Sequence, residues 1–191
     1  MKLQAIKKNC LNKLRFEIIN TPSGAQWIGD GGSFWAVDGM RLNEEMIPAL
    51  FDLTEKQICN CVIREIEVQA LMWANREGYR GERQLDPLGM IWCEKDLYLA
   101  LSIENEGLIM IPERALKPLR KDDEYRMYAL RDNVVAVYSD LLCDALICPM
   151  TPGAVDLIMA TANRAAGLPL WAVPEPDETE CAEPQMGEIE Q

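Results

Sequence analysis

Residues 27–40 read WIGDGGSFWAVDGM, and this stretch decides how the first part of the chain folds. Three glycines surround Asp30, and apolar residues lie on both sides of them. Asp-Gly and Gly-Gly pairs supply the positive φ angles that tight hairpin turns require. The stretch therefore predicts two strands joined by a turn at Asp30–Gly32.

Two ligand-binding interpretations of the same glycines are less well supported. A phosphate-binding P-loop needs Lys-Ser or Lys-Thr after its glycines, and neither pair follows here. A dinucleotide-binding fingerprint needs a third glycine where this chain has Phe34. A ligand loop and catalysis by Asp30 stay open as alternatives, but the hairpin is favoured and no cofactor is expected.

Working outward from the turn, turn residues and apolar patterns predict an α+β fold built from antiparallel sheets and short helices. Strands are expected at Leu3–Lys7, Leu14–Asn20, Gln26–Gly29, Met90–Trp92, Leu97–Leu101, Leu108–Ile111, Tyr125–Leu130, Val134–Tyr138 and Leu141–Cys148. Helices are expected at Asn43–Phe51, Pro112–Leu119 and Ala154–Ala165. The polar segment 74–87 is expected to be a loop.

Residues 54–73 give conflicting signals. Thr54 and Gln57 form the sequence pattern of a capping box, which favours a helix. The Cys-Val-Ile and Ile-Glu-Val runs that follow favour a strand instead. Helix and strand therefore both remain open for this segment.

The length of 191 residues and the 49% hydrophobic content predict a folded chain with a substantial core. We expect a single domain at 1–171, with a β-rich hairpin segment at 1–40, and an acidic tail rich in Pro and Glu at 172–191. No apolar run is long enough to span a membrane, and the first residues lack the apolar region of a secretion signal. A cytoplasmic location is the expectation.

The chain contains no histidine, which excludes Ser-His, Cys-His and His-metal mechanisms. Its seven cysteines include no C-x2-C pair of the kind that holds structural zinc. The cysteines are therefore expected to be free thiols buried in the core, and no metal is expected.

The formal net charge of −12 is concentrated toward the C-terminus. Residues 172–191 hold seven acids and no base, which leaves 24 acids against 19 bases, or −5, in residues 1–171. Such a chain is expected to bind a protein with a basic, nucleic-acid-binding surface rather than nucleic acid or a membrane. The candidate partner-binding residues are Leu170, Trp171, Glu175, Asp177, Glu178, Glu180 and Glu183.

One segment resembles half of a DNA sliding-clamp domain. Residues 109–150 read IMIPERALKPL, RKDDEYRMYAL, RDNVVAVYSD and LLCDALICPM, and the resemblance covers 107–148. A similar strand, short helix and strand run from Trp35 into the segment after Ile58, about 70 residues earlier. The resemblance implies duplicated β-α-β-β units, a clamp-like half at 88–150 and homo-oligomeric rings. Their inner surface would be basic, with Lys117, Arg120 and Lys121 as contributors.

The N-terminal layout, with W-I-G-D-G and V-D-G before an acidic helix, is similar to small acidic phage proteins of gut Clostridia. Some of those proteins are type II-A anti-CRISPR inhibitors of an RNA-guided nuclease. The resemblance implies a phage inhibitor that binds the nuclease.

Three functions are consistent with the sequence. The favoured one is a non-catalytic interaction protein, a DNA mimic or inhibitor whose acids fill a basic groove. The second is a clamp-related replication accessory protein. The third is an enzyme that uses carboxylates with Mg²⁺, through Asp30, Asp38 or the Asp122–Asp123 pair.

Overall fold

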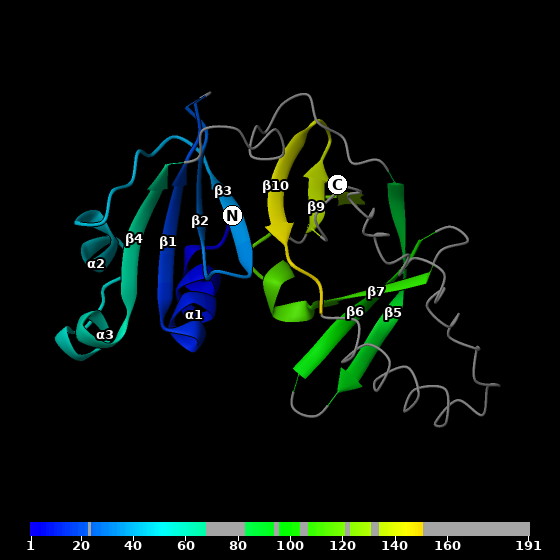
Figure 1. The fold of residues 1–191 in the computed structure, drawn as a ribbon, viewed down its shortest axis with the longest axis horizontal. Coiled ribbons are helices and arrows are strands. Elements are labelled where there is room, and N and C mark those ends of the chain that lie inside the picture. Colours follow the sequence, from blue (N-terminus) through cyan, green and yellow to red (C-terminus); the bar gives the residue numbers. More distant parts are fainter. Residues whose placement is uncertain are drawn as a thin grey trace, which may run out of the picture.

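The computed structural model describes residues 1–22, 24–67, 83–93, 96–103, 107–120, 123–130 and 134–150. Ten strands form one mixed sheet in the order β4-β1-β2-β3-β10-β9-β8-β5-β6-β7 (Figure 1). The strands are β1 (Arg15–Asn20), β2 (Gln26–Gly29), β3 (Ser33–Val37), β4 (Val62–Glu67), β5 (Arg83–Cys93), β6 (Asp96–Ile103), β7 (Gly107–Pro112), β8 (Tyr125–Leu130), β9 (Val134–Ser139) and β10 (Leu142–Ile147). The helices are α1 (Leu3–Lys13), α2 (Met46–Leu50), α3 (Glu55–Asn60) and the 3₁₀ helix η2 (Glu113–Leu116). The predicted α+β class is confirmed, but the expected antiparallel sheets are one mixed sheet, because β4 pairs in parallel with β1.

The sheet joins the two ends of the described chain through the pairing of β3 with β10. Adjacent strands are antiparallel except β1 and β4, which pair in parallel. Toward the other edge, β5, β6 and β7 run obliquely to β1–β3 (Figure 1). The junction between these strands and the rest of the sheet is short, because β5 pairs with β8 only through Arg83, Gln84 and Leu85.

The turn predicted at Asp30–Gly32 joins β2 to β3. Asp30 Oδ1 accepts hydrogen bonds from the backbone N–H groups of Gly32 at 2.9 Å and Ser33 at 2.7 Å. Gly31 has a φ of 86°, and a Cβ there would lie 2.9 Å from Cδ of Arg15. The positive φ favours glycine at this position, and β2 and β3 pair as antiparallel strands on either side of the turn, so the hairpin interpretation of the opening stretch is confirmed.

The strand predicted at Leu3–Lys7 is wrong, because these residues begin helix α1. Ile6 and Cys10 are fully buried one helical turn apart and anchor the helix on the sheet. The helix ends at Lys13, and its C-cap Leu14 is a non-glycine residue in the left-handed region with a φ of 52°. Tertiary packing of this apolar stripe outweighs the local β-like pattern.

Both signals in residues 54–73 are correct, each over part of the segment. The capping box forms, with the Thr54 side chain accepting from Gln57 N while the Gln57 side chain accepts from Thr54 N. Helix α3 lasts only to Asn60, and β4 follows at Val62. Residues 68–73 lie outside the described ranges. Just upstream, the predicted cap Asn43 accepts from Met46 N, and α2 begins at Met46.

The predicted loop at 74–87 is wrong from Arg83 onward, where β5 begins, and residues 74–82 lie outside the described ranges. Leu85 faces the core and is 2% exposed, which explains why this polar stretch is held in the sheet. Pro87 lies beside a bulge between Pro87 and Gly89 in the β5–β6 pairing. A bulge is one of the few places where a sheet tolerates proline.

The strands expected between residues 90 and 148 are confirmed as parts of β5 to β10. The helix expected at Pro112–Leu119 is the shorter η2. The helix expected at Ala154–Ala165 and the tail at 172–191 lie outside the described residues.

The sheet contains two segments with a common strand order. In each, three antiparallel strands precede a helical segment, and the next strand returns to pair with the first: β4 with β1, and β8 with β5. The return strands differ in direction, since β4 is parallel to β1 whereas β8 is antiparallel to β5.

The larger core cluster lies between one face of the sheet and the helices, and it includes Ile6, Ile47 and Ala115. In a second cluster, which contains Trp27 and Leu146, the described members are all strand residues. Hydrogen bonds tie η2 to the N-terminal elements: Trp35 Nε1 donates to Ala115 O at 2.9 Å, and Asn9 Nδ2 donates to Arg114 O at 2.8 Å. The described helices include none with the length and apolar character needed to cross a bilayer.

Candidate functional site

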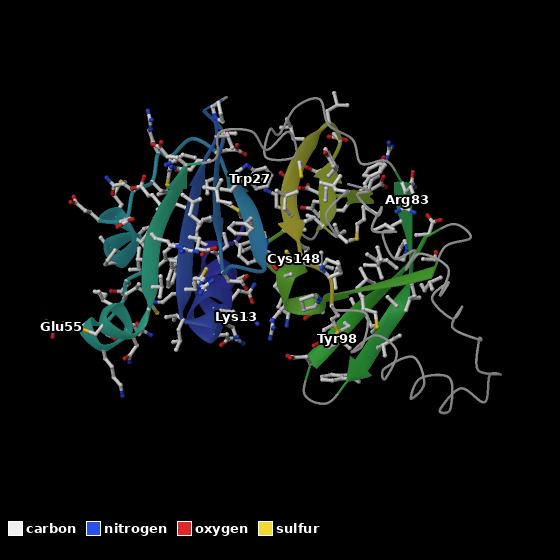
Figure 2. The ribbon with its side chains drawn as sticks, viewed as in Figure 1. Lys13, Trp27, Glu55, Arg83, Tyr98 and Cys148 are labelled. Carbon is white, nitrogen blue, oxygen red and sulfur yellow. The ribbon has the colours of Figure 1, made fainter. Side chains whose placement is uncertain are left out.

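One edge of the sheet is rich in exposed acids, and we call it the acidic end. It comprises the exposed acidic residues of segment 38–67, namely Asp38, Glu44, Glu45, Asp52, Glu55, Glu65 and Glu67. These seven acids stand against three bases in the same segment, Arg41, Lys56 and Arg64. Figure 2 shows Glu55 at the outer margin of this end, far across the sheet from Arg83 and Tyr98.

Two of these acids are held in place by each other's backbone. The N–H of Glu65 donates to Glu44 Oε1 at 2.7 Å, and the N–H of Glu44 donates to Glu65 Oε1 at 3.1 Å. Asn20 Nδ2 donates to Glu65 Oε2 at 3.0 Å. Backbone and amide donors therefore hold the carboxylates of these two exposed residues in fixed positions.

Arg64, which precedes Glu65 in β4, pairs with a buried acid. Its Nε donates to Glu17 Oε1 at 2.9 Å, and its Nη2 contacts the same oxygen. The Glu17 side chain is 4% exposed, and Arg15 Nη1 lies 3.6 Å from it. Because Arg64 compensates this buried charge, it offsets the surface acids less than a free arginine would.

Asp30, the catalytic candidate, has a structural position in the turn, where it accepts the two backbone hydrogen bonds already described. The Asp30 carboxylate also influences the pKa of two cysteine thiols. Desolvation and, to a lesser degree, the Asp30 carboxylate raise the pKa of Cys10, which is buried, and of Cys148. Both thiols are therefore held in the protonated form at neutral pH, which is the less nucleophilic form. Cys148 and Cys59 are exposed, so the expectation that the cysteines are buried is wrong for these two.

The other acids of the enzyme hypothesis lie apart from Asp30. Asp38 is at the opposite end of β3 from the Asp30 turn. Asp123 precedes β8 and accepts a hydrogen bond from Tyr125 Oη at 3.2 Å, while Asp122 lies outside the described ranges. Within the part of the chain that the structure describes, no three His, Cys, Asp or Glu side chains are grouped so as to hold a metal ion.

The basic residues of the clamp hypothesis are described in part. Lys117 Nζ pairs with Glu113 Oε2 at 2.8 Å, one helical turn earlier. Arg120 is exposed, and its backbone N–H donates to Tyr125 Oη at 2.9 Å. Lys121 lies outside the described ranges.

A hollow of about 510 Å³ opens beside the β1–β2 turn and the end of β3. Its lining includes Gln26, Asp38 and Arg41. The Gln26 side-chain amide is hydrogen-bonded to the backbone of Leu42: its Oε1 accepts from Leu42 N at 2.6 Å, and its Nε2 donates to Leu42 O at 2.8 Å. The hollow therefore lies beside Asp38 of the acidic end, with Arg41 in the same lining.

The predicted partner-binding residues, Leu170, Trp171, Glu175, Asp177, Glu178, Glu180 and Glu183, all lie outside the described residues. The acidic end was not singled out from the sequence, because its acids are spread over thirty positions and several read as helix-start residues. The excess of acids over bases in 38–67 was the signal that could have found it.

No known protein family matches the chain, and no curated protein or solved structure matches it either.

Proposed function

We propose that this chain is a non-catalytic interaction protein that occupies the basic, nucleic-acid-binding groove of a nucleic-acid-processing protein. The target class is an RNA-guided nuclease, and the chain acts in the cytoplasm as an acidic, phage-type inhibitor of the anti-CRISPR kind. The observation that carries the proposal is the acidic end, where Glu44 and Glu65 are held side by side while Arg64 is engaged with Glu17.

This arrangement favours binding to a basic groove for a physical reason. A flexible acidic side chain loses conformational freedom when it binds, and fixing it beforehand removes part of that cost. Acids on one edge of a rigid sheet also create a local negative potential that steers a positively charged partner into contact. The remaining exposed acids of the acidic end extend this potential along α2, α3 and β4.

The C-terminal residues extend the same interaction. The seven acids after Ala172 double the number of acids available to the partner, and Leu170 with Trp171 supplies an apolar anchor. An aromatic residue beside acids is a common composition for a binding determinant, because Trp contributes a large contact area at a small entropy cost.

The proposal is tested by competition for a guide-loaded type II-A nuclease. Increasing amounts of the chain are added to the nuclease and a labelled target duplex, and bound duplex is measured by fluorescence anisotropy. We expect the chain to reduce duplex binding, and less so at high salt, which screens the charges. If duplex binding stays unchanged with the chain in large excess, RNA-guided nucleases of this type are excluded as the target.

The contribution of the tail is measured in the same assay with the chain at full length. In a tail-neutral variant, Glu175, Glu178, Glu180 and Glu183 become Gln and Asp177 becomes Asn. We expect weaker competition from this variant than from the native chain. Equal competition would assign the interaction to the acidic end alone.

The clamp-related accessory function is the second candidate, and the strand order shared by β1–β4 and β5–β8 supports it. The opposite direction of the two return strands weighs against a duplicated clamp unit. Ring-shaped oligomers in electron micrographs, and duplex DNA retained only when circular, would favour the clamp over the inhibitor.

A further inference from the structure

Three strands have backbone at an edge of the sheet, namely β4, β7 and the outer half of β5, and they differ in how that edge is protected. β4 is a six-residue edge strand with three charged residues, and the Glu44 side chain accepts a hydrogen bond from one of its backbone N–H groups. On β7, Met110 O accepts from Met150 N at 3.0 Å, and Met110 and Ile111 are fully buried. Charges, capping and covering are common protections of a sheet edge.

The outer half of β5, Gly89–Cys93, lies past the charged Asp86 and the bulge at Pro87, and it has none of these protections in the described ranges. Beyond Leu85, β5 pairs with β6 on one side, and no described strand pairs with it on the other. Gly89–Cys93 carries no charge. Met90 is 52% exposed and Trp92 is 72% exposed, and Leu88 at the bulge is 63% exposed. An uncharged strand edge with large exposed apolar side chains is a template for another strand.

The register of β5 places Met90 and Trp92 on one face. Past the bulge, Met90 lies opposite Leu99 and Trp92 opposite Leu97, two positions further along each strand. Side chains two residues apart point to the same face of a strand. Ile91 lies midway between them, so a two-fold axis through Ile91 would bring Met90 of one copy against Trp92 of the other.

We infer that the outer half of β5 is a homodimer interface, in which Gly89–Cys93 of two copies pair as antiparallel edge strands around Ile91. The two Met–Trp contacts place a thioether against an indole, a favourable combination. Pairing of identical segments also satisfies the symmetry of a two-fold interface, which uses the same surface on both copies.

Charge favours a second copy at this place. Two chains of net charge −12 repel each other wherever acidic surfaces meet, as they would at the β4 edge. Because Gly89–Cys93 is uncharged, two copies can pair along this stretch without bringing acidic side chains together there. Because the paired stretch is short, the dimer should be weak and depend on concentration.

Sedimentation velocity over a range of concentrations tests this inference with the full chain. We expect the apparent mass to rise with concentration from 21.6 kDa toward twice that value. Trp92→Lys places two cations near the axis and should keep the chain at the monomer mass. The control Leu141→Lys alters a residue of similar exposure, 67%, in the β9–β10 turn, and should sediment like the native chain.

The register has its own test. Directly opposed residues of an antiparallel pair lie at Cα separations that suit a disulfide. Ile91→Cys should therefore give more cross-linked dimer on mild oxidation than the native chain or Leu141→Cys. A native chain that stays monomeric at every concentration overturns the inference, as does an Ile91→Cys chain that cross-links no more than the two controls. Association only with a different protein's strand would also overturn it.

Discussion

Glu44 and Glu65 bind each other's backbone: each carboxylate accepts a hydrogen bond from the N–H of the other residue. Glu65 belongs to the edge strand β4, and Glu44 belongs to the segment that precedes α2. The pair therefore closes part of the sheet edge and fixes two negative charges there. One contact serves both the fold and the proposed function.

The first prediction concerns the edge contact. Glu44→Ala should remove the acceptor for the N–H of Glu65 and speed hydrogen exchange at that amide, because the edge donor returns to water. The loss of stability should be about 1 kcal/mol, the usual contribution of one hydrogen bond. Exchange is measured by NMR, and Glu44→Gln, which keeps an acceptor oxygen, is the control. An unchanged exchange rate in Glu44→Ala would contradict the contact.

A second prediction concerns the ion pair of Glu17 and Arg64. Arg64→Ala should cost about 2 kcal/mol of unfolding free energy, because it leaves a buried carboxylate without its principal partner. In a Glu17→Gln background the same substitution should cost less than about 1 kcal/mol, since no buried charge remains. Urea unfolding of the four proteins in this cycle measures the difference. Equal costs in both backgrounds would show that the two side chains are not coupled.

A third prediction concerns the structural role of Asp30 in the β2–β3 turn. Asp30→Ala should cost about 2 kcal/mol, because two backbone N–H groups lose their acceptor in a buried turn. Asp30→Asn keeps an acceptor oxygen and should lose much less. Thermal unfolding gives both values. If Asn proves as damaging as Ala, the negative charge of Asp30, and not only its acceptor oxygen, contributes to the stability of the turn.

A fourth prediction concerns the pH dependence of stability. Burial, together with the Asp123 carboxylate, raises the pKa of Tyr125 from 10.0 to about 12. The folded state therefore favours the neutral phenol, and its contribution is complete below pH 10 and is lost as the pH rises toward about 12. The stability difference between the native chain and Tyr125→Phe should shrink over that interval. A difference that is constant across it would contradict the raised pKa.

The sequence predicts the elements whose signals are local. The Asp30–Gly32 turn and the capping box at Thr54 form as expected, because each depends on residues within four positions of one another. Helix α1 and the start of β5 were predicted wrongly, because Ile6 and Leu85 are held by packing against distant strands. Local propensity carries no information about that packing.

The candidate surfaces depend even more on distant contacts. The acidic end requires Glu44 and Glu65 to meet across twenty-one positions of the chain. The open edge of β5 depends on β8 pairing with only its first residues. Neither arrangement can be read from composition. What the sequence does predict is the sign of the charge, and that sign led to the proposed class of partner.

The central claim is that acids at one edge of the sheet occupy a basic groove, and a matched pair of charge reversals tests it most directly. Glu45→Lys with Glu67→Lys alters the acidic end, and Asp86→Lys with Glu124→Lys makes the same change in charge on exposed residues elsewhere. In duplex competition for the guide-loaded nuclease, the first variant should be weaker than the native chain by about tenfold, and the second by no more than about twofold. Equal weakening of both variants would contradict the account.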